Sequence, residues 1–409
     1  MSSSNSAFAA LRHRDFRLLW LGQIVSVTGT QMQFVAINWH VYLLTKSALA
    51  LGLVGLFRGV PVILCSLAGG VVADAVDRKR LMIVTQTVML ASAALLTAGT
   101  LAGFESVWPI YVLSAIASAA TAFDVPARQA LMPTLVSIED FPNAVSLGII
   151  VFNVATIAGP AIAGVLLAES GPAIIYGLNA LSFLAVIGAL VAMGSSGQPD
   201  LQTERKDALS VAALKEGLRF VWHTPIIVQT MTLDFVATFF ASATLLLPIF
   251  AQERLHVGAR GYGLLAAAPA IGSVLTALVM ARLGTLQRQG RLVVASVAVF
   301  GVATAAFGVS TAYWVSLLML AITGAADTVS TVLRQTIRQL VTPNHLRGRM
   351  TSINMMFFMG GPQLGELEAG VVAAIIGAPL SVVIGGLGSL IAAAIAAVKS
   401  KSLMEFEIK

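Results

Sequence analysis

The sequence predicts an all-α polytopic membrane protein with twelve transmembrane helices in two pseudo-symmetric bundles of six. Only 11% of its 409 residues are charged and 57% are hydrophobic, whereas a soluble domain is roughly 25% charged. The charged residues cluster and leave apolar windows of about 20 residues, the length that spans the hydrocarbon core of a bilayer. Because these windows are continuously apolar, the alternating pattern of a membrane β-barrel is excluded.

The apolar runs fall into two groups of six. We expect a first bundle over residues 1–194, a polar cytoplasmic loop at 195–222 and a second bundle over 223–409. The first group comprises residues 16–44, 49–74, 81–103, 107–128, 142–168 and 173–194. The second comprises residues 226–251, 262–281, 291–309, 314–334, 349–375 and 379–398.

Composition and motifs exclude several functional classes. The single cysteine, Cys65, lies in an apolar run, so neither a disulfide framework nor a thiolate metal site is expected. The sequence has no nucleophile elbow, metal-ligand spacing or phosphate-binding loop. We therefore expect no enzyme activity, no catalytic residue, no metal, no cofactor and no coupling to ATP within this chain. The net charge of +6 does not indicate nucleic acid, because the cations lie between apolar runs.

The cations predict the orientation in the membrane. If residues 1–15 are cytoplasmic, 21 of the 25 Lys and Arg residues lie in cytoplasmic connections, tails or adjacent helix ends. Only Lys46, Arg254 and Arg260 fall outside, and Arg58 lies within a span. Cytoplasmic loops carry an excess of Lys and Arg, so both termini are expected in the cytoplasm. The expected location is the cell inner membrane.

The two halves resemble each other in sequence. Each half carries an Arg-Gln pair upstream of a Gly-Pro pair: Arg128-Gln129 and Gly159-Pro160 in the first, Arg334-Gln335 and Gly361-Pro362 in the second. Two parallel repeats related by an axis along the membrane normal are a transporter architecture. The expected partners are therefore the lipid bilayer and a small-molecule substrate, and we expect a monomer.

Residues 69–80 close one apolar run and end in three cations before the next run. Gly70 has no side chain, so another helix can approach it closely. Asp74 and Arg78 are four residues apart and are expected to share a helix face. This stretch resembles the signature of the major facilitator superfamily between its second and third helices, with Ala75 and Asp77 as departures from that pattern.

The form of this signature is similar to the branch of transmembrane-secretion-effector-like exporters, which includes enterobactin and macrolide efflux proteins. Residues 16–23, 126–133 and 346–349 also resemble that branch, so the resemblance covers essentially the whole chain. It implies the major facilitator fold and a cytoplasmic gate. In that gate Gly70, Asp74 and Arg78 on the first bundle are expected to meet Arg347 and Arg349 on the second.

A second motif of the superfamily matches the fifth predicted helix. Gly159, Pro160 and Gly164 correspond to the motif that is associated with export by antiport. Pro160 removes a backbone donor and kinks a helix, and the flanking glycines permit tight packing. A purely structural kink is the alternative interpretation.

Ionisable residues inside a membrane are costly and are functional candidates by default. Asp327, Glu366 and Asp234 are the candidates for proton coupling, because burial favours the neutral form of a carboxyl group. The alternative for Glu366 is a hydrated position near the outer mouth. For Asp234 and for Arg58, which lie at a similar depth, a charge pair and a substrate site are both open. Asp327 is equally compatible with coupling and with a substrate contact.

The candidates for a substrate cavity are polar or aromatic residues in otherwise apolar spans: Arg58, Gln33, Asn38, Asp124 and Phe239. For Asp124, an ion pair with Arg128 one turn later is the favoured interpretation. For Phe239, a position facing lipid or the core is equally compatible with the sequence.

We therefore predict a secondary active transporter that works by alternating access, as a proton-coupled exporter of small amphipathic molecules of the drug or siderophore type. An importer or facilitator of a small nutrient is one alternative. A membrane sensor without transport activity is another.

Overall fold

The computed structural model describes residues 8–103, 106–194, 219–240, 243–284, 286–343 and 346–407, and these are almost entirely helical. Contacts divide the chain into two compact units. Unit 1 comprises residues 1–46, 57–200 and 258–267, and unit 2 comprises residues 47–56, 201–257 and 268–409. Residues 195–218, which make up most of the predicted cytoplasmic loop, lie outside the described residues.

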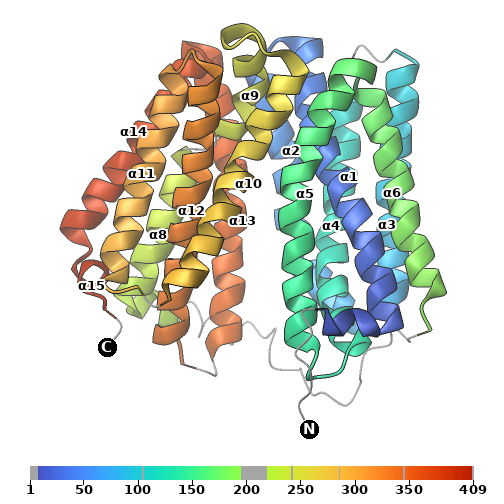
Figure 1. The fold of residues 1–409 in the computed structure, drawn as a ribbon, viewed down its shortest axis with the longest axis horizontal. Coiled ribbons are helices and arrows are strands. Elements are labelled where there is room, and N and C mark those ends of the chain that lie inside the picture. The colour runs from blue at the N-terminus through green and yellow to red at the C-terminus, as the bar shows by residue number, and fades with distance from the viewer. Residues whose placement is uncertain are drawn as a thin grey trace. The chain divides into compact units, whose positions relative to one another are not determined.

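The first half of the chain forms a short 3₁₀ helix and six long α-helices (Figure 1). They are η1 (Ala9–Arg12), α1 (Arg14–Thr45), α2 (Ala48–Ala75), α3 (Arg78–Leu101), α4 (Trp108–Leu135), α5 (Phe141–Ser170) and α6 (Pro172–Ala192).

The second half begins with one interrupted helix. It comprises α8 (Pro225–Phe240), η2 (Ala243–Leu246), α9 (Leu247–Ile249) and η3 (Phe250–Arg254). It continues with α10 (Gly258–Leu283), α11 (Gln289–Val309), α12 (Tyr313–Val341), α13 (Arg347–Ile376), α14 (Ala378–Lys399) and α15 (Lys401–Met404).

Ten of the described helical segments are long and apolar enough to cross a membrane. The helices α1 and α13 have 32 and 30 residues and are not among these ten. Many large apolar side chains on the helices are exposed, among them Leu64 at 72% and Val191 at 67%. Exposed apolar surface on this scale is typical of a protein that faces lipid.

The helices of the two units pack in the same order. In unit 1 the neighbours run α4, α3, α6, α1 and α5. In unit 2 they run α12, α11, α14, α8 and α13 (Figure 1). Each helix of the first order corresponds to the helix six predicted spans later in the chain, which stands at the same place in the second order. This shared order is the arrangement that the sequence repeat predicts.

The start of α1 is attached to the start of α5. The backbone N–H of Ala10 donates to Asn143 Oδ1 at 3.0 Å, and His13 Nε2 donates to Asp140 Oδ2 at 2.9 Å. The hydrogen bond from His13 lowers the pKa of the Asp140 carboxyl. The stabilisation is therefore present above the unfolded-state pKa of Asp140 and is lost as the pH falls through its folded-state pKa.

Helices α10 and α12 cross in unit 2 at two glycines. A Cβ atom added at Gly324 would lie 1.9 Å from the carbonyl oxygen of Pro269, and one at Gly272 would lie 1.8 Å from that of Ala321. Ser273 Oγ also donates to the carbonyl oxygen of Gly324 at 3.0 Å. Small residues of this kind let helix backbones approach closely inside a membrane.

Replacing Gly324 with alanine should destabilise the protein, because the added methyl group meets backbone that cannot move aside. We expect a loss of about 1–3 kcal/mol in the free energy of unfolding, the usual cost of overpacking. The matched control is Gly188→Ala on α6, where an added Cβ meets no described atom within 4 Å. Thermal unfolding of both variants in detergent measures the difference. Equal melting temperatures would contradict this account of the crossing.

Candidate functional site

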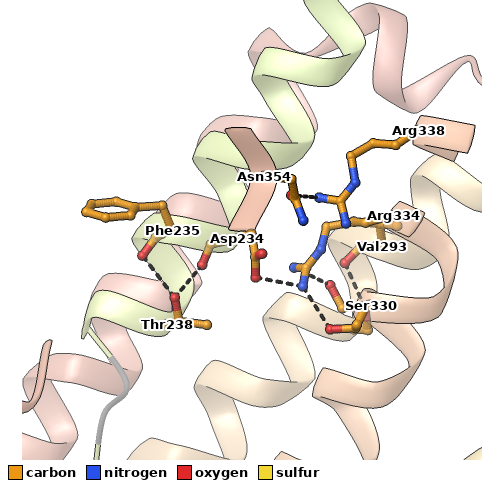
Figure 2. A network of polar contacts seen from close by, with 10 residues as sticks. Asp234, Phe235, Thr238, Val293, Ser330, Arg334, Arg338 and Asn354 are labelled. Carbon is orange, nitrogen blue, oxygen red and sulfur yellow. Dashed lines mark hydrogen bonds and ion pairs between the residues drawn. The ribbon is translucent and has the colours of Figure 1, made fainter. Parts of the chain in front are cut away.

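A buried ion pair joins α8 and α12 in unit 2. Arg334 Nη2 lies 2.6 Å from Asp234 Oδ1, and the two side chains are 2% and 7% exposed. Figure 2 shows Arg334 between Asp234 on one side and Ser330 on the other. Taking two charges out of water costs several kcal/mol per ion, and their attraction offsets this only where further hydrogen bonds satisfy both groups.

The rest of the hydrogen bonding to Arg334 comes from its own helix. Its Nη1 donates to Ser330 Oγ at 2.8 Å, and its Nη2 donates to Thr331 Oγ1 at 3.0 Å. These hydroxyls lie one turn earlier, at the i−4 and i−3 positions that share a helix face with Arg334. Among the described residues, the buried Arg334 Nε has no hydrogen-bond partner. Asp234 Oδ1 is close to the guanidinium but accepts no well-aligned hydrogen bond there.

Asp327 is linked to this pair through Thr331. It lies two turns before Arg334 on α12, and the Thr331 hydroxyl forms a hydrogen bond with its carboxylate. Thr331 thus accepts from Arg334 and can donate to Asp327. The Asp327 side chain is only partly exposed and lines a partly open cavity.

A second arginine completes the charge balance. Arg338 follows Arg334 by one turn and is 4% exposed, and its Nη1 donates to Asn354 Oδ1 of α13 at 2.5 Å. The network therefore contains two carboxylates and two guanidinium groups. With both acids ionised, its net charge is zero.

The sequence of α12 explains why these groups meet. Five polar residues of this helix follow the pattern i, i+3, i+4, i+7, i+11: Asp327, Ser330, Thr331, Arg334 and Arg338. This spacing places them along one face. Polar residues on one face of an apolar helix are the sequence pattern that indicates this network. The same pattern indicates that Arg334 and Arg338 belong to the network and are not helix-end cations.

Two cavities lie beside the network in unit 2. The larger has a volume of about 250 Å³. Its lining is apolar and hydroxyl-bearing, with Asp327 as its single charged residue. The smaller is about 10 Å³ and is lined by Asp234, Asp327 and Arg334, so its volume is close to the space that one water molecule needs. Thr238, Phe300 and Asp327 line both cavities.

The corresponding position in unit 1 carries a neutral contact. Arg128 on α4 occupies the place in the Arg-Gln repeat that Arg334 occupies on α12. It donates to Gln23 Oε1 on α1, the helix that corresponds to α8. The residue seven positions before Arg128 is Thr121, where α12 has Asp327. At these positions, unit 1 has Gln23 and Thr121, whereas unit 2 has the carboxylates of Asp234 and Asp327.

A model of the transmembrane secretion effector family matches residues 5–408 of the chain. The chain belongs to this family of major facilitator transporters. Enterobactin exporters EntS are similar to it over 379 residues, 93% of this chain and 90% of theirs. The identity is 25% for Citrobacter koseri and 24% for Salmonella typhimurium. As a member of this family with ten candidate spans, the chain is a multi-pass membrane protein.

Solved structures of low sequence identity show the same fold. A POT family transporter in complex with a thioalcohol-conjugated peptide matches with a TM-score of 0.76 at 10% identity, covering 96% of this chain and 97% of that one. The nucleoside transporter NupG matches with a TM-score of 0.71 at 14% identity, covering 96% and 100%. A bacterial homologue of the iron transporter ferroportin matches at 0.70 and 15%, covering 96% and 99%.

Among the predicted coupling residues of this transporter, the structure brings Asp234 and Asp327 together and places Glu366 elsewhere. A Cβ atom added at Gly55 of α2 would lie 2.5 Å from Glu366 Oε2, so this acid faces the first turns of α2. Phe239 stacks on Phe235 with ring centroids 6.0 Å apart and meets Phe240 edge-to-face at 5.2 Å. It is not among the residues that line the two cavities.

The expected pair between Asp124 and Arg128 is not formed. Asp124 is buried and accepts hydrogen bonds from Thr85 Oγ1 at 3.0 Å and Gln86 Nε2 at 2.9 Å, both on α3. The carboxylate is therefore satisfied inside unit 1. The prediction is wrong because the Asp124 side chain is directed to α3, whereas Arg128 donates to Gln23 on α1.

The other polar candidates in unit 1 also have internal contacts. Gln33 accepts from Asn179 Nδ2 on α6 at 2.7 Å. Arg58 lies over the ring of Phe34, with its guanidinium carbon 4.2 Å from the ring centroid. Asn38 is buried and forms a hydrogen bond with the Tyr262 side chain.

The predicted shared helix face of Asp74 and Arg78 is wrong, because a helix boundary separates them. α2 ends at Ala75, and Asp77 caps α3 by accepting from the backbone N–H of Arg80 at 3.0 Å. Arg78 Nη1 instead donates to the carbonyl oxygen of Ala130 at 3.1 Å. Asp74 is exposed and has no partner among the described residues.

The close approach predicted at Gly70 occurs one residue earlier. A Cβ atom added at Gly69 would lie 2.2 Å from the carbonyl oxygen of Ala122 on α4, whereas one at Gly70 would meet no described atom within 4 Å. The remaining predicted gate residues, Arg347 and Arg349, have side chains outside the described residues. Their backbone begins α13.

The Gly-Pro motif lies in a continuous α5, which runs through Pro160. A Cβ atom added at Gly159 would lie 2.6 Å from Gln31 Cβ on α1, and one at Gly164 would lie 2.8 Å from Gly263 Cα. Both glycines therefore permit close helix packing within unit 1.

Removing one partner of the Asp234–Arg334 pair should destabilise the protein strongly. Asp234→Asn or Arg334→Gln leaves an uncompensated buried charge, which typically costs about 3–5 kcal/mol. In the double variant both charges are absent, so its loss in unfolding free energy should be smaller than the sum of the two single losses. Chemical unfolding in mixed micelles provides this double-mutant cycle.

The control pair is His13 and Asp140, whose side chains are 34% and 28% exposed. His13→Gln and Asp140→Asn should change stability far less, because exposed ion pairs contribute little. Additive losses for Asp234→Asn and Arg334→Gln would show that the two buried charges do not depend on each other.

Proposed function

We propose that this protein is a secondary active transporter that exports small amphipathic molecules in exchange for protons. Membership of the secretion effector family and similarity to proteins named enterobactin exporters support export. The observation that carries the coupling is the position of Asp327. It lines a cavity of about 250 Å³ and is joined through Thr331 to the buried Asp234–Arg334 pair.

In this proposal the proton acts by changing the balance of a neutral network. With Asp327 ionised, the Thr331 hydroxyl donates to its carboxylate and accepts from Arg334. Protonation removes one negative charge, and the cluster of two acids and two arginines then carries a net positive charge. Asp234 is then the carboxylate that balances the charge of Arg334. The electrostatic attraction between α12 and α8 therefore changes with the charge of Asp327. A ligand can shift a conformational equilibrium only through such a difference between states.

The membrane arrangement that we propose has twelve spans, because α1 and α13 also exceed the roughly 20 residues needed to cross a bilayer. The distribution of cations supports cytoplasmic termini in the inner membrane. The protein would act as a monomer by alternating access, driven by the proton gradient without a cofactor. The cations of 347–349 and the exposed Asp74 would form its cytoplasmic gate.

A transport assay in inverted membrane vesicles tests the coupling. Enterobactin and ethidium are offered as substrates, with the vesicle interior made acidic. One pH unit supplies about 1.4 kcal/mol, enough for about tenfold accumulation in an exchange of one proton for one neutral molecule. We expect Asp327→Asn to abolish the stimulation by the gradient and Asp234→Asn to impair transport.

Glu366→Gln tests the other sequence candidate in the same assay. Glu169→Gln serves as the matched control, because Glu169 is 54% exposed and pairs with Arg260. Transport that is indifferent to the gradient, or to Asp327→Asn, would contradict the proposed coupling.

A further inference from the structure

The larger cavity of unit 2 has a charge pattern that selects one class of ligand. Its lining combines five hydroxyl-bearing residues and two phenylalanines with one carboxylate: Thr238, Thr244, Ser273, Thr304, Thr323, Phe300, Phe307 and Asp327. Neither Arg334 nor Arg338 lines it. A ligand inside this cavity therefore meets the Asp327 carboxylate and no guanidinium group.

We propose that this cavity binds the cationic group of a small aromatic or amphipathic monocation, with Asp327 as its counter-ion. The inference rests on the proposed function and specifies the charge of the substrate. The aromatic faces of Phe300 and Phe307 attract cations electrostatically, and an opposite charge close to a buried carboxylate stabilises the pair. An anion at the same place would be repelled by Asp327.

The two arginines cannot replace the ligand as partners of Asp327 without breaking their own contacts. Arg334 is held by Asp234, Ser330 and Thr331. Arg338 is directed to Asn354 on α13. The carboxylate of Asp327 is thus stabilised at a distance by Arg334 and through the Thr331 hydroxyl, and its cavity side is available to a ligand.

A proton and a ligand cation add the same charge at the same carboxylate. Among the described residues, the charged groups that act on Asp327 are Asp234 on α8 and Arg334 on α12, and Arg338 acts in turn on these two. The described residues that α10 and α11 contribute to the cavity are uncharged. Helix α13 contributes Pro362. Glu366 lies one turn further along α13 and faces Gly55. Since the network is neutral when Asp327 is ionised, the proton and the cation compete for it. This competition exchanges one proton for one bound cation.

Equilibrium binding to the purified full-length protein in detergent tests the proposal without any gradient. The probe is benzyltrimethylammonium, whose charge does not change with pH, and benzoate is the anionic comparison. We expect the cation to bind at alkaline pH and to weaken by up to tenfold per pH unit once Asp327 takes up a proton. Calorimetry in buffers of different ionisation heats should show proton release on binding.

Asp327→Asn should weaken the binding of the cation at least tenfold and remove both the pH dependence and the proton release. Phe300→Leu should weaken binding roughly threefold, the size of a modest cation–π contribution, and keep the pH dependence. It provides an independent readout if Asp327→Asn does not fold. Glu169→Gln should change nothing.

Tighter binding of benzoate, binding of the cation without pH dependence, or binding unaffected by both Asp327→Asn and Phe300→Leu would overturn the proposal. Failure of the cation to bind, together with gradient-driven transport of enterobactin, would overturn the charge assignment and leave the proposed export intact. Binding of the cation without gradient-driven transport of any offered compound would support the cavity assignment and count against proton-coupled export.

Discussion

The buried pair of Asp234 and Arg334 is the constraint on which the arrangement of unit 2 depends. Two charges with 7% and 2% exposure can persist there only if each is neutralised and hydrogen-bonded. The pair therefore fixes the approach of α8 to α12, and α12 supplies Ser330 and Thr331 to hold the guanidinium. Because Thr331 also contacts Asp327, the same requirement connects the ion pair to the cavity.

The two related units use equivalent positions in different ways. In unit 1, Arg128 meets the neutral Gln23, and the buried Asp124 is satisfied by Thr85 and Gln86. In unit 2, the equivalent arginine meets a carboxylate, and a second carboxylate faces a cavity. This difference is the basis for placing the proposed proton coupling in the second unit, while the buried polar groups named for the first unit bond to its neighbouring helices.

Sequence patterns predicted the helices and part of the site. The observed helices cover the apolar runs, because hydropathy reports directly on membrane insertion, although α4 and α12 each continue seven residues beyond the predicted ends at 128 and 334. The stretch at 226–251 is an exception, since its outer part is divided among η2, α9 and η3 around Pro248. Asp234 and Asp327 were recognised as candidates, because a carboxyl group in an apolar run stands out without any knowledge of its neighbours.

The partners of these acids could not be predicted in the same way. The apolar run 314–334 predicts a helix end at Arg334, whereas α12 continues to Val341 and buries this residue. The four-residue spacing of Asp74 and Arg78 predicts one shared helix face, whereas Asp77 caps a new helix between them. Asp124 and Arg128 lie one turn apart but contact α3 and α1, respectively. In each case the contact depends on where a helix ends or how it is rotated, which tertiary packing decides and spacing along the chain does not.

The proposed coupling requires Asp327 to take up and release the transported proton. Infrared difference spectroscopy across a pH titration of the purified protein in lipid measures this directly, because a protonated carboxyl group has its own C=O stretching band. We predict a pH-dependent carboxyl band that disappears in Asp327→Asn, shifts in Thr331→Val and is unchanged in Glu169→Gln. Persistence of the same band in Asp327→Asn would contradict the account.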